Sequence, residues 1–207
     1  MSLHKTQRPL RGFTLTEAAI VLGIMGLILG AIWVAAGAVY TNLRVSHASD
    51  QILQIAQNIR TLSASSPTMD AGLDTAAVLV QSGVYPKDLV SGTMAAPVIT
   101  NQWGGTAWVA PATMITAGDS FSVTLGGIPT DACTSLIMRN AGSSDSNTGL
   151  IGVAVAAGLG GAASGAATTA SAPPVSAATA TTACVANTGV AGTAAANAVT
   201  FYFRLKG

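Results

Sequence analysis

Residues 11–39 read RGFTLTEAAIVLGIMGLILGAIWVAAGAV, a short polar segment followed by a long apolar one. The polar segment ends in Glu17, the only glutamate of the chain, and residues 18–39 carry no charge. A carboxylate beside a hydrophobic helix is costly to bury unless a positive charge meets it. Glu17 therefore predicts a cationic partner, which need not belong to the same chain.

The apolar run is long enough to cross a membrane. Its 22 residues, at about 1.5 Å each, would reach about 33 Å, and a bilayer core is about 30 Å thick. Only cations precede Glu17, whereas the first charge after the run, Arg44, is soon followed by Asp50. The positive-inside tendency predicts a cytoplasmic N-terminus and an exported remainder. Within the run, Gly26 and Gly30 match a small-xxx-small pattern, which lets helices approach closely in lipid.

The residues before the run favour cleavage ahead of the apolar helix. A secretory signal has a shorter apolar core, of about 7–15 residues, followed by an A-x-A-like site. Residues 31–36 offer a poor version of that site. Gly12 instead puts a small residue, and so a possible cut, before the helix. A cut there would remove the leader and keep the helix.

At these residues the chain resembles the prepilins of type IV pili and type II secretion systems. The resemblance implies that a dedicated inner-membrane aspartic peptidase cuts after Gly12 and methylates Phe13, the new N-terminal residue. It also implies a glutamate at the fifth mature position, which is Glu17 when counted from Phe13. The likeness covers roughly the first forty residues: a basic leader, a Gly-Phe pair, the motif T-L-T-E and the apolar span.

Electrostatics explains what Glu17 would do in such a filament. When the spans leave lipid and stack, the new α-amino group of Phe13 would be buried at low dielectric, where an unpaired charge is strongly unfavourable. Glu17 of a neighbouring subunit would neutralise it. The pair would also set the register, because a subunit docked at another height would bury both charges unmatched. The alternative is a solvated interfacial carboxylate without a partner.

A second helical pattern follows the span. One long helix is predicted from about Phe13 to about Leu62, ended by residues 65–67. Its first half is apolar all round and needs lipid or other subunits, whereas its second half is one-sided and packs on its own globular domain. The apolar residues of that second half recur at spacings of three and four: Val45, Ala48, Ile52, Ile55, Ile59 and Leu62.

The remainder is long enough for one globular domain. Asp74 is expected to cap a short helix that ends at Gly83. Residues 98–103 and 106–109 flank two glycines and are expected to form a hairpin. Residues 120–125 and the alternating residues 199–205 read as further strands, and a helix opens at residues 129–131. The predicted fold class is α+β, with a long N-terminal helix, its apolar half protruding, packed on an antiparallel sheet.

Two further stretches resemble the type IVb pilins, such as those of bundle-forming, toxin-coregulated and conjugative thin pili. They are residues 99–105, ITNQWGG, and residues 128–133, IPTDAC. This resemblance implies a disulfide between Cys133 and Cys184 that encloses a variable surface region. Cysteine usage agrees, because the only two cysteines lie in the part expected to reach an oxidising compartment. Two buried free thiols are the alternative.

Between residues 141 and 198 the composition shifts to Ala, Gly, Thr and Ser. Because such residues bury little area each, loops and short edge strands held by the disulfide are predicted there. Their outer side is expected to form the exposed filament surface. Residues 158–163 match the dinucleotide pattern G-x-G-x-x-A, but no acid follows, so we interpret the match as chance.

Composition argues against catalysis, metal binding and nucleic-acid binding as the main role. With one glutamate, and with His4 in the leader and His47 on the long helix, no catalytic residue, cofactor or metal site is expected. The net charge is +1, and removal of Lys5, Arg8 and Arg11 with the leader leaves six cations against eight acids, or −2. Nucleic acid is therefore not expected as the principal ligand.

Four segments are predicted: a cytoplasmic leader at residues 1–12, a transmembrane and filament-core helix at 13–39, its amphipathic continuation at 40–65, and an α+β pilin head at 66–207. The span lacks the proline that many type IVa pilins carry, which favours a type IVb pilin or a pseudopilin. The low-charge, small-residue outer region suits dense packing and favours the major subunit. The expected role is a filament for adhesion, aggregation or conjugation. The chain would sit in the inner membrane as a precursor and then in the extracellular pilus.

The expected partners are copies of the chain itself, a prepilin peptidase, an inner-membrane assembly platform with its ATPase, the membrane before assembly, and a host-cell or recipient-cell surface. Two other interpretations stay open. One is a pseudopilin or minor pilin of a type II secretion or competence system. The other is a signal-anchored periplasmic binding domain, which a mature chain beginning at methylated Phe13 would exclude.

Overall fold

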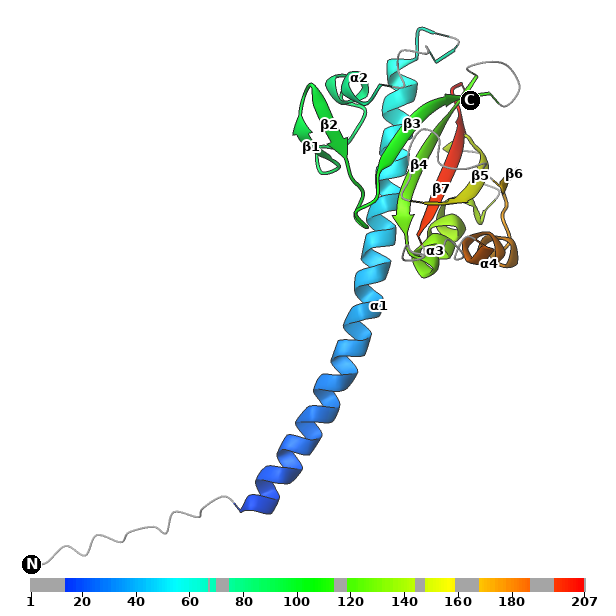
Figure 1. The fold of residues 1–207 in the computed structure, drawn as a ribbon. Helices are drawn as coiled ribbons and strands as arrows, with labels where there is room; N and C mark the ends of the chain where they lie inside the picture. The colour runs from blue at the N-terminus through cyan, green and yellow to red at the C-terminus, as the bar shows by residue number, and fades with distance from the viewer. Residues whose placement is uncertain are drawn as a thin grey trace, which may run out of the picture. The chain divides into compact units, whose positions relative to one another are not determined.

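The computed structural model describes residues 14–66, 68–69, 75–113, 119–143, 148–158, 168–186 and 196–206. The chain divides into two units, Met1–Thr41 and Asn42–Gly207. Helix α1, Leu15–Leu62, contributes its first part to one unit and its second part to the other. The sheets and the other helices all belong to the second unit (Figure 1).

The second part of α1 packs on the globular unit as the apolar spacing predicts. Val45, Ile52, Ile55 and Ile59 are buried on one face of the helix. Leu62 is the exception, because it is the last residue of the helix and its side chain is 41% exposed. The buried stripe therefore ends one turn before the helix does, and the prediction for Leu62 was wrong.

A five-stranded antiparallel sheet forms the body of the second unit, which confirms the α+β class (Figure 1). Its strand order is β3-β4-β7-β5-β6, so the C-terminal strand β7, Asn197–Arg204, lies at the centre. Its partner β4, Ser120–Ile128, brings Phe121 to a stacked contact with Phe203, their ring centroids 5.6 Å apart. The alternation of buried and less buried residues at 199–205 confirms the predicted strand.

The expectation for residues 141–198 was wrong in part. β5, Leu150–Ala157, is an interior strand between β7 and the edge strand β6, Thr168–Ser171, and Ala177–Ala186 form helix α4. Val153 and Val155 are buried on the strand, as are the small residues Ala154 and Ala156. The prediction considered only how much area the side chains of this segment can bury. An interior strand is also held by backbone hydrogen bonds to both neighbouring strands, and small residues form these bonds as well as large ones do.

The two-glycine segment turns the chain but does not form the predicted hairpin. β1, Val90–Thr93, and β2, Ala96–Ile99, pair with each other in a separate two-stranded sheet, whereas β3, Ala107–Ala112, pairs with β4. A single bridge, Thr100 to Thr106, joins the segments on either side of the turn. The turn therefore passes the chain from one sheet to the other.

Asn101 holds this turn against β4. Its side-chain amide nitrogen donates to the carbonyl oxygen of Gly126 at 2.6 Å, and its amide oxygen accepts from the backbone N–H of Trp103 at 2.9 Å and of Gly105 at 3.2 Å. A Cβ at Gly105 would lie 1.9 Å from the Gly126 oxygen, so only glycine permits this approach. Asn101 and Gly105 of the NQWGG stretch are therefore needed for the packing of this turn against β4.

Helix α2, Ala76–Gln81, exists as predicted, with Ser82 as its C-cap and Gly83 directly after the cap. Gly83 has a positive φ of 70° and donates its N–H to Val80, while Val84 donates to Leu79. This is a Schellman cap, in which buried Leu79 and Val84 supply the accompanying apolar contact. The helix N-cap is Thr75, and Asp74 lies outside the described residues.

A disulfide joins the helix after β4 to helix α4 at one end of the sheet (Figure 1). Helix α3, Thr130–Ala141, opens after Pro129 as predicted and carries Cys133, which bonds to Cys184 of α4 with the Cα atoms 6.0 Å apart. Both cysteines are fully buried. The bridge closes a loop that contains β5 and β6, so it fastens the small-residue segment to the rest of the second unit.

Replacing both cysteines by serine should lower the free energy of unfolding by about 4 kcal/mol, because the unfolded chain regains the freedom of a loop of about 50 residues. Urea titration of the full chain in detergent, followed by tryptophan fluorescence, measures the change. Ser135→Ala, which removes an exposed hydroxyl on α3, is the control and should change stability by less than about 0.5 kcal/mol. A double variant as stable as the parent would contradict the prediction.

Asn101→Ala should destabilise the second unit by about 2–4 kcal/mol, since it leaves three backbone groups, two buried and one partly buried, without their partner. Asn101→Asp keeps the acceptor for Trp103 and Gly105 but loses the donor to Gly126, so it should also be destabilising. The same urea titration measures both variants. Ser91→Ala, which removes one exposed hydrogen bond to Val98 on the hairpin, serves as the control. Equal stabilities of Asn101→Ala and Ser91→Ala would disprove the role assigned to the amide.

Candidate assembly surface

The first part of α1 presents an apolar surface that its own chain does not cover. From residue 15 to residue 41 every side chain is exposed except Ala18, which is partly buried. Leu27 and Trp33 are each 78% exposed. Within the part of the chain that the structure describes, α1 is the one helix long and apolar enough to cross a membrane. A surface of this kind has to be covered by lipid or by other protein.

The glycines of this segment pack against none of the residues that the structure describes. A Cβ at Gly23, Gly26, Gly30 or Gly37 would meet nothing within 4 Å. Glycine in a helix interior destabilises it by about 1 kcal/mol relative to alanine, so four glycines in one helix need a compensating contact. The close approach of another helix at Gly26 and Gly30 would be such a contact.

Glu17 lies at the third position of α1 and is exposed. Thr14, directly before the helix, accepts a hydrogen bond from the Glu17 backbone N–H at 3.4 Å, and its hydroxyl donates to the carboxylate at 3.5 Å. This is a partial capping arrangement, and the helix dipole favours an acid at this end. Sequence reasoning did not identify this local role, although the spacing T-x-x-E was the signal for it.

Thr14 gives Glu17 a hydrogen-bond partner but does not neutralise its negative charge. Among the described residues no cation lies within ion-pair distance of the carboxylate. Gly12 and Phe13, the two residues predicted to be the processing site, lie outside the described residues.

Arg60 fastens the other end of α1 to the sheet. Its Nε donates to the carbonyl of Arg204 at 3.1 Å and its Nη2 to that of Thr148 at 2.8 Å, and its guanidinium carbon lies 5.9 Å from the Phe203 ring centroid. Burial lowers the pKa of the guanidinium, which nevertheless stays charged. Sequence reasoning missed this residue, because its contacts are with carbonyls far along the chain.

A polar cluster ties the middle of α1 to the loops around β1 and β2. Gln51 donates to the Asp88 carboxylate at 2.5 Å, and Nδ1 of His47 lies 3.9 Å from the same carboxylate. Gln102 contacts His47 through its side-chain amide. His47 is thus engaged in a side-chain network, and within the described ranges no group of three or more His, Cys, Asp or Glu side chains could hold a metal ion.

The globular part of the chain matches a known protein family. Residues 43–202 match the family model PilS, described as PilS N terminal, and this range covers most of the chain. The chain belongs to the PilS family of type IVb pilins. The matched range coincides closely with the second unit, so the membership rests on the globular part and not on the apolar run or Glu17.

Two solved structures are similar to this PilS-family chain. One is the crystal structure of a type IVb pilin from Salmonella typhi, 22% identical, which covers 75% of this chain and 95% of that chain with a TM-score of 0.43. The other is the NMR structure of the type IVb pilin PilS from Salmonella typhi, 23% identical, covering 77% and 95% with a TM-score of 0.42. The comparison with curated proteins gives no match.

Proposed function

We propose that this pilin polymerises through the first part of α1 into an extracellular type IVb-like filament. The observation that carries the proposal is the exposure of the apolar side chains at residues 15–41. Burial of apolar surface contributes about 25 cal/mol per Å² removed from water. Outside the membrane, helices of this kind would therefore be strongly stabilised by packing against one another. One heterologous contact repeated with open symmetry gives a fibre.

Charge pairing would set the position of each copy in that fibre. Cleavage after Gly12 would create an α-amino group at Phe13, four residues before Glu17. The Thr14 hydroxyl near the carboxylate is neutral, so it cannot compensate a buried charge. An amine and a carboxylate from adjacent subunits would neutralise each other, and only at the height where both are buried together.

The route to the filament follows from the order of segments along the chain. Residues 1–12 would hold the cationic leader in the cytoplasm and residues 13–39 would cross the inner membrane. A prepilin peptidase would remove the leader, and an assembly platform with its ATPase would extract the chain from the membrane. Residues 40–65 and 66–207 would then be the amphipathic half-helix and the head that the finished pilus presents.

The filament would serve adhesion, aggregation or conjugation through the surface of the second unit. A pseudopilin or minor pilin of a secretion or competence system is the second candidate, because it would carry the same leader and span. Membership of the PilS family favours a pilin over a signal-anchored periplasmic binding domain. Identification of this chain as the dominant protein of purified fibres, by mass, would establish it as the major subunit.

The mature protein should begin at Phe13 and carry one additional methyl group. Intact-mass measurement of the chain isolated from filaments or membranes, in a host with the cognate peptidase, checks this. Gly12→Val should block the cut, because a bulky side chain would then replace the small residue at the cleavage position, and should leave a full-length chain in the membrane. A chain that still begins at Met1, where the peptidase is active, would refute the processing step.

Glu17→Ala should leave processing and membrane insertion intact but reduce filaments by about 100-fold or more. The reason is that an unpaired buried amine costs about 3–5 kcal/mol for each subunit. Glu17→Gln should fail similarly, since an amide keeps the size but not the charge. Sheared filaments quantified against membrane-bound chain give the measurement.

Thr14→Ala is the matched control for the Glu17 variants. It removes the local cap, at a cost of about 1 kcal/mol to the helix, and retains the carboxylate. It should still form filaments. Normal polymerisation of Glu17→Ala alone would rule out the charge pair, and equal loss in Thr14→Ala would show that the cap, and not the charge, is what assembly needs.

A further inference from the structure

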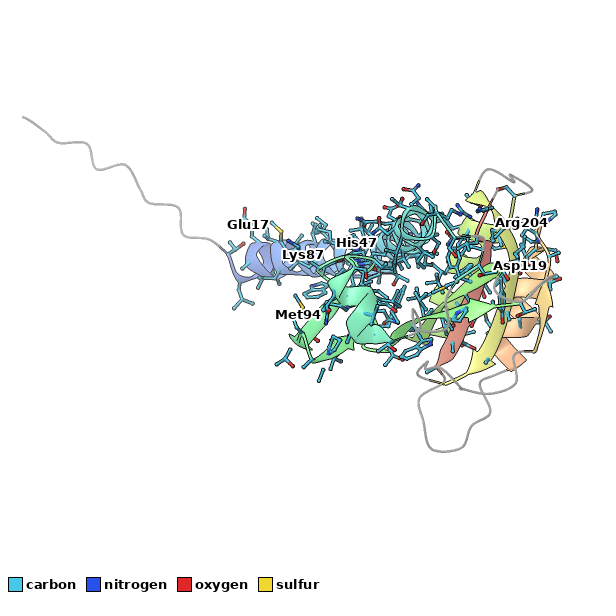
Figure 2. All side chains as sticks on the ribbon, turned by 90° about the horizontal axis from the view of Figure 1, so that it is seen from above. Glu17, His47, Lys87, Met94, Asp119 and Arg204 are labelled. Carbon is cyan, nitrogen blue, oxygen red and sulfur yellow. A yellow bond between two sulfur atoms is a disulfide. The ribbon has the colours of Figure 1, made fainter. Side chains whose placement is uncertain are left out.

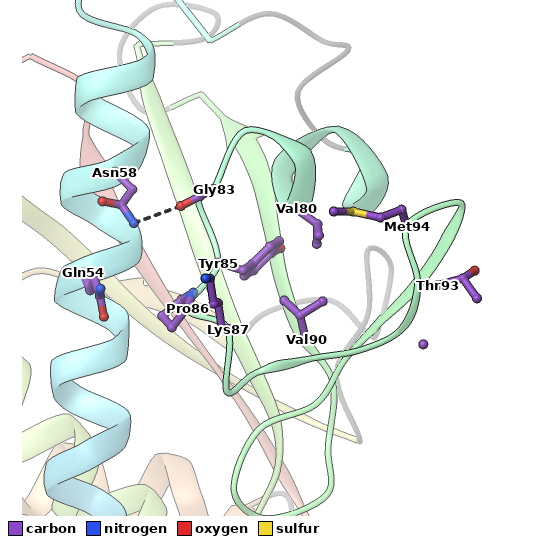
Figure 3. Close-up of a pocket in the computed structure, with 11 residues that line it drawn as sticks. Gln54, Asn58, Val80, Gly83, Tyr85, Pro86, Lys87, Val90, Thr93 and Met94 are labelled. Carbon is purple, nitrogen blue, oxygen red and sulfur yellow. Dashed lines mark hydrogen bonds between the residues drawn. The ribbon is translucent and has the colours of Figure 1, made fainter.

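A groove in the second unit has no role in the proposed assembly. It lies between the second part of α1, helix α2 and the β1–β2 hairpin, and has a volume of about 540 Å³ (Figure 3). We name it the Lys87 groove after its only charged lining residue. Pockets that hold small molecules measure about 300–1,000 Å³, so the groove has the size of a ligand site.

One side of the Lys87 groove is apolar. Val80 of α2, Val90 and Met94 of the hairpin, and Tyr85 and Pro86 line it. Burial raises the pKa of the Tyr85 phenol, so this ring stays neutral. Met94 is 67% exposed at the hairpin turn, on the far side of the unit from Arg204 (Figure 2). Exposed apolar side chains beside a groove are unfavourable in water and favour an occupant with an apolar body.

The other side is polar and carries the positive charge. Gln54 and Asn58 project from α1, with Lys87 between them and the apolar wall (Figure 3). Asn58 donates to the carbonyls of both Gly83 and Val84, which leaves its amide oxygen as an acceptor. The groove therefore offers hydrogen-bonding groups along α1 and one ammonium close to an apolar surface.

The acid next to Lys87 in sequence does not neutralise it. Asp88 accepts a hydrogen bond from Gln51 and lies beside His47, so its carboxylate is engaged on α1. Among the residues that the structure describes, Lys87 forms no ion pair. The lining residues carry one positive charge and no negative one, and an anionic group would complement them.

We propose that the Lys87 groove binds an amphipathic carboxylate, its apolar body against Tyr85, Val90 and Met94 and its acid group on the Lys87 ammonium. The proposal concerns the second unit alone and does not depend on filament formation. Ligands with an apolar part and a single carboxylate, such as aryl-alkanoic acids, fit the volume and the charge. The neutral analogue of the same shape would lack the ion pair and bind less tightly.

The test uses the full chain in lipid nanodiscs, labelled with ¹³C at the methionine methyl groups. Met94 reports on the groove, whereas Met69 and Met138 are internal references, and Met94→Leu assigns the signal. Titration with 4-phenylbutyrate should move the Met94 signal with a Kd on the order of 1 mM or tighter, within reach of a ligand this small. 4-Phenylbutanol should bind more weakly.

Lys87→Gln should raise the Kd of 4-phenylbutyrate by about threefold, the effect of losing a solvent-exposed ion pair. The Kd of 4-phenylbutanol should not change. Lys206→Gln removes an exposed lysine outside the groove and is the control. An unmoved Met94 signal, equal binding of acid and alcohol, or no effect of Lys87→Gln would each overturn the proposal. A Met94 signal that shifts with protein concentration alone would assign the groove to a second copy instead.

Discussion

The exposure of an apolar helix is the constraint on which everything else depends. The first part of α1 buries none of its large side chains within its own chain, and in water this surface would be strongly unfavourable. Under the proposed assembly, lipid would cover this surface before polymerisation and other copies would cover it afterwards. A single helix would then serve first as membrane anchor and later as filament core. Glu17 at its start would distinguish the two environments, because a bundle of helices would bury the carboxylate and a membrane interface would not.

The second unit holds the second part of α1 firmly. Two kinds of contact do this. Apolar residues of α1, such as Ile52 and Ile55, are fully buried in the core, and Arg60 donates hydrogen bonds to carbonyls on two segments that are far apart in sequence. The disulfide between Cys133 and Cys184 fastens the small-residue segment to the same unit. Force applied through α1 would therefore reach the whole sheet.

The sequence motifs that mark the family have structural reasons of their own. Asn101 and Gly105 press a turn against β4, and the stretch at residues 128–133 ends that strand and opens the helix that carries Cys133. Both motifs act where the chain passes from one layer to another, and small or hydrogen-bonding residues are needed because backbones approach closely there. The Lys87 groove lies between α1, α2 and the β1–β2 hairpin.

The sequence by itself determined the long helix and the last strand, because these follow from local periodicity. The leader at residues 1–12 and the charged partner of Glu17 stay predictions. The cysteine pair was predictable, since the chain has only two. Tertiary structure alone decided that β7 lies at the centre, that β5 is interior, that the glycine turn joins two sheets, and that Lys87 borders a groove. These depend on pairing between segments distant in the chain, which composition and periodicity do not encode, and on backbone hydrogen bonds that any residue type can make.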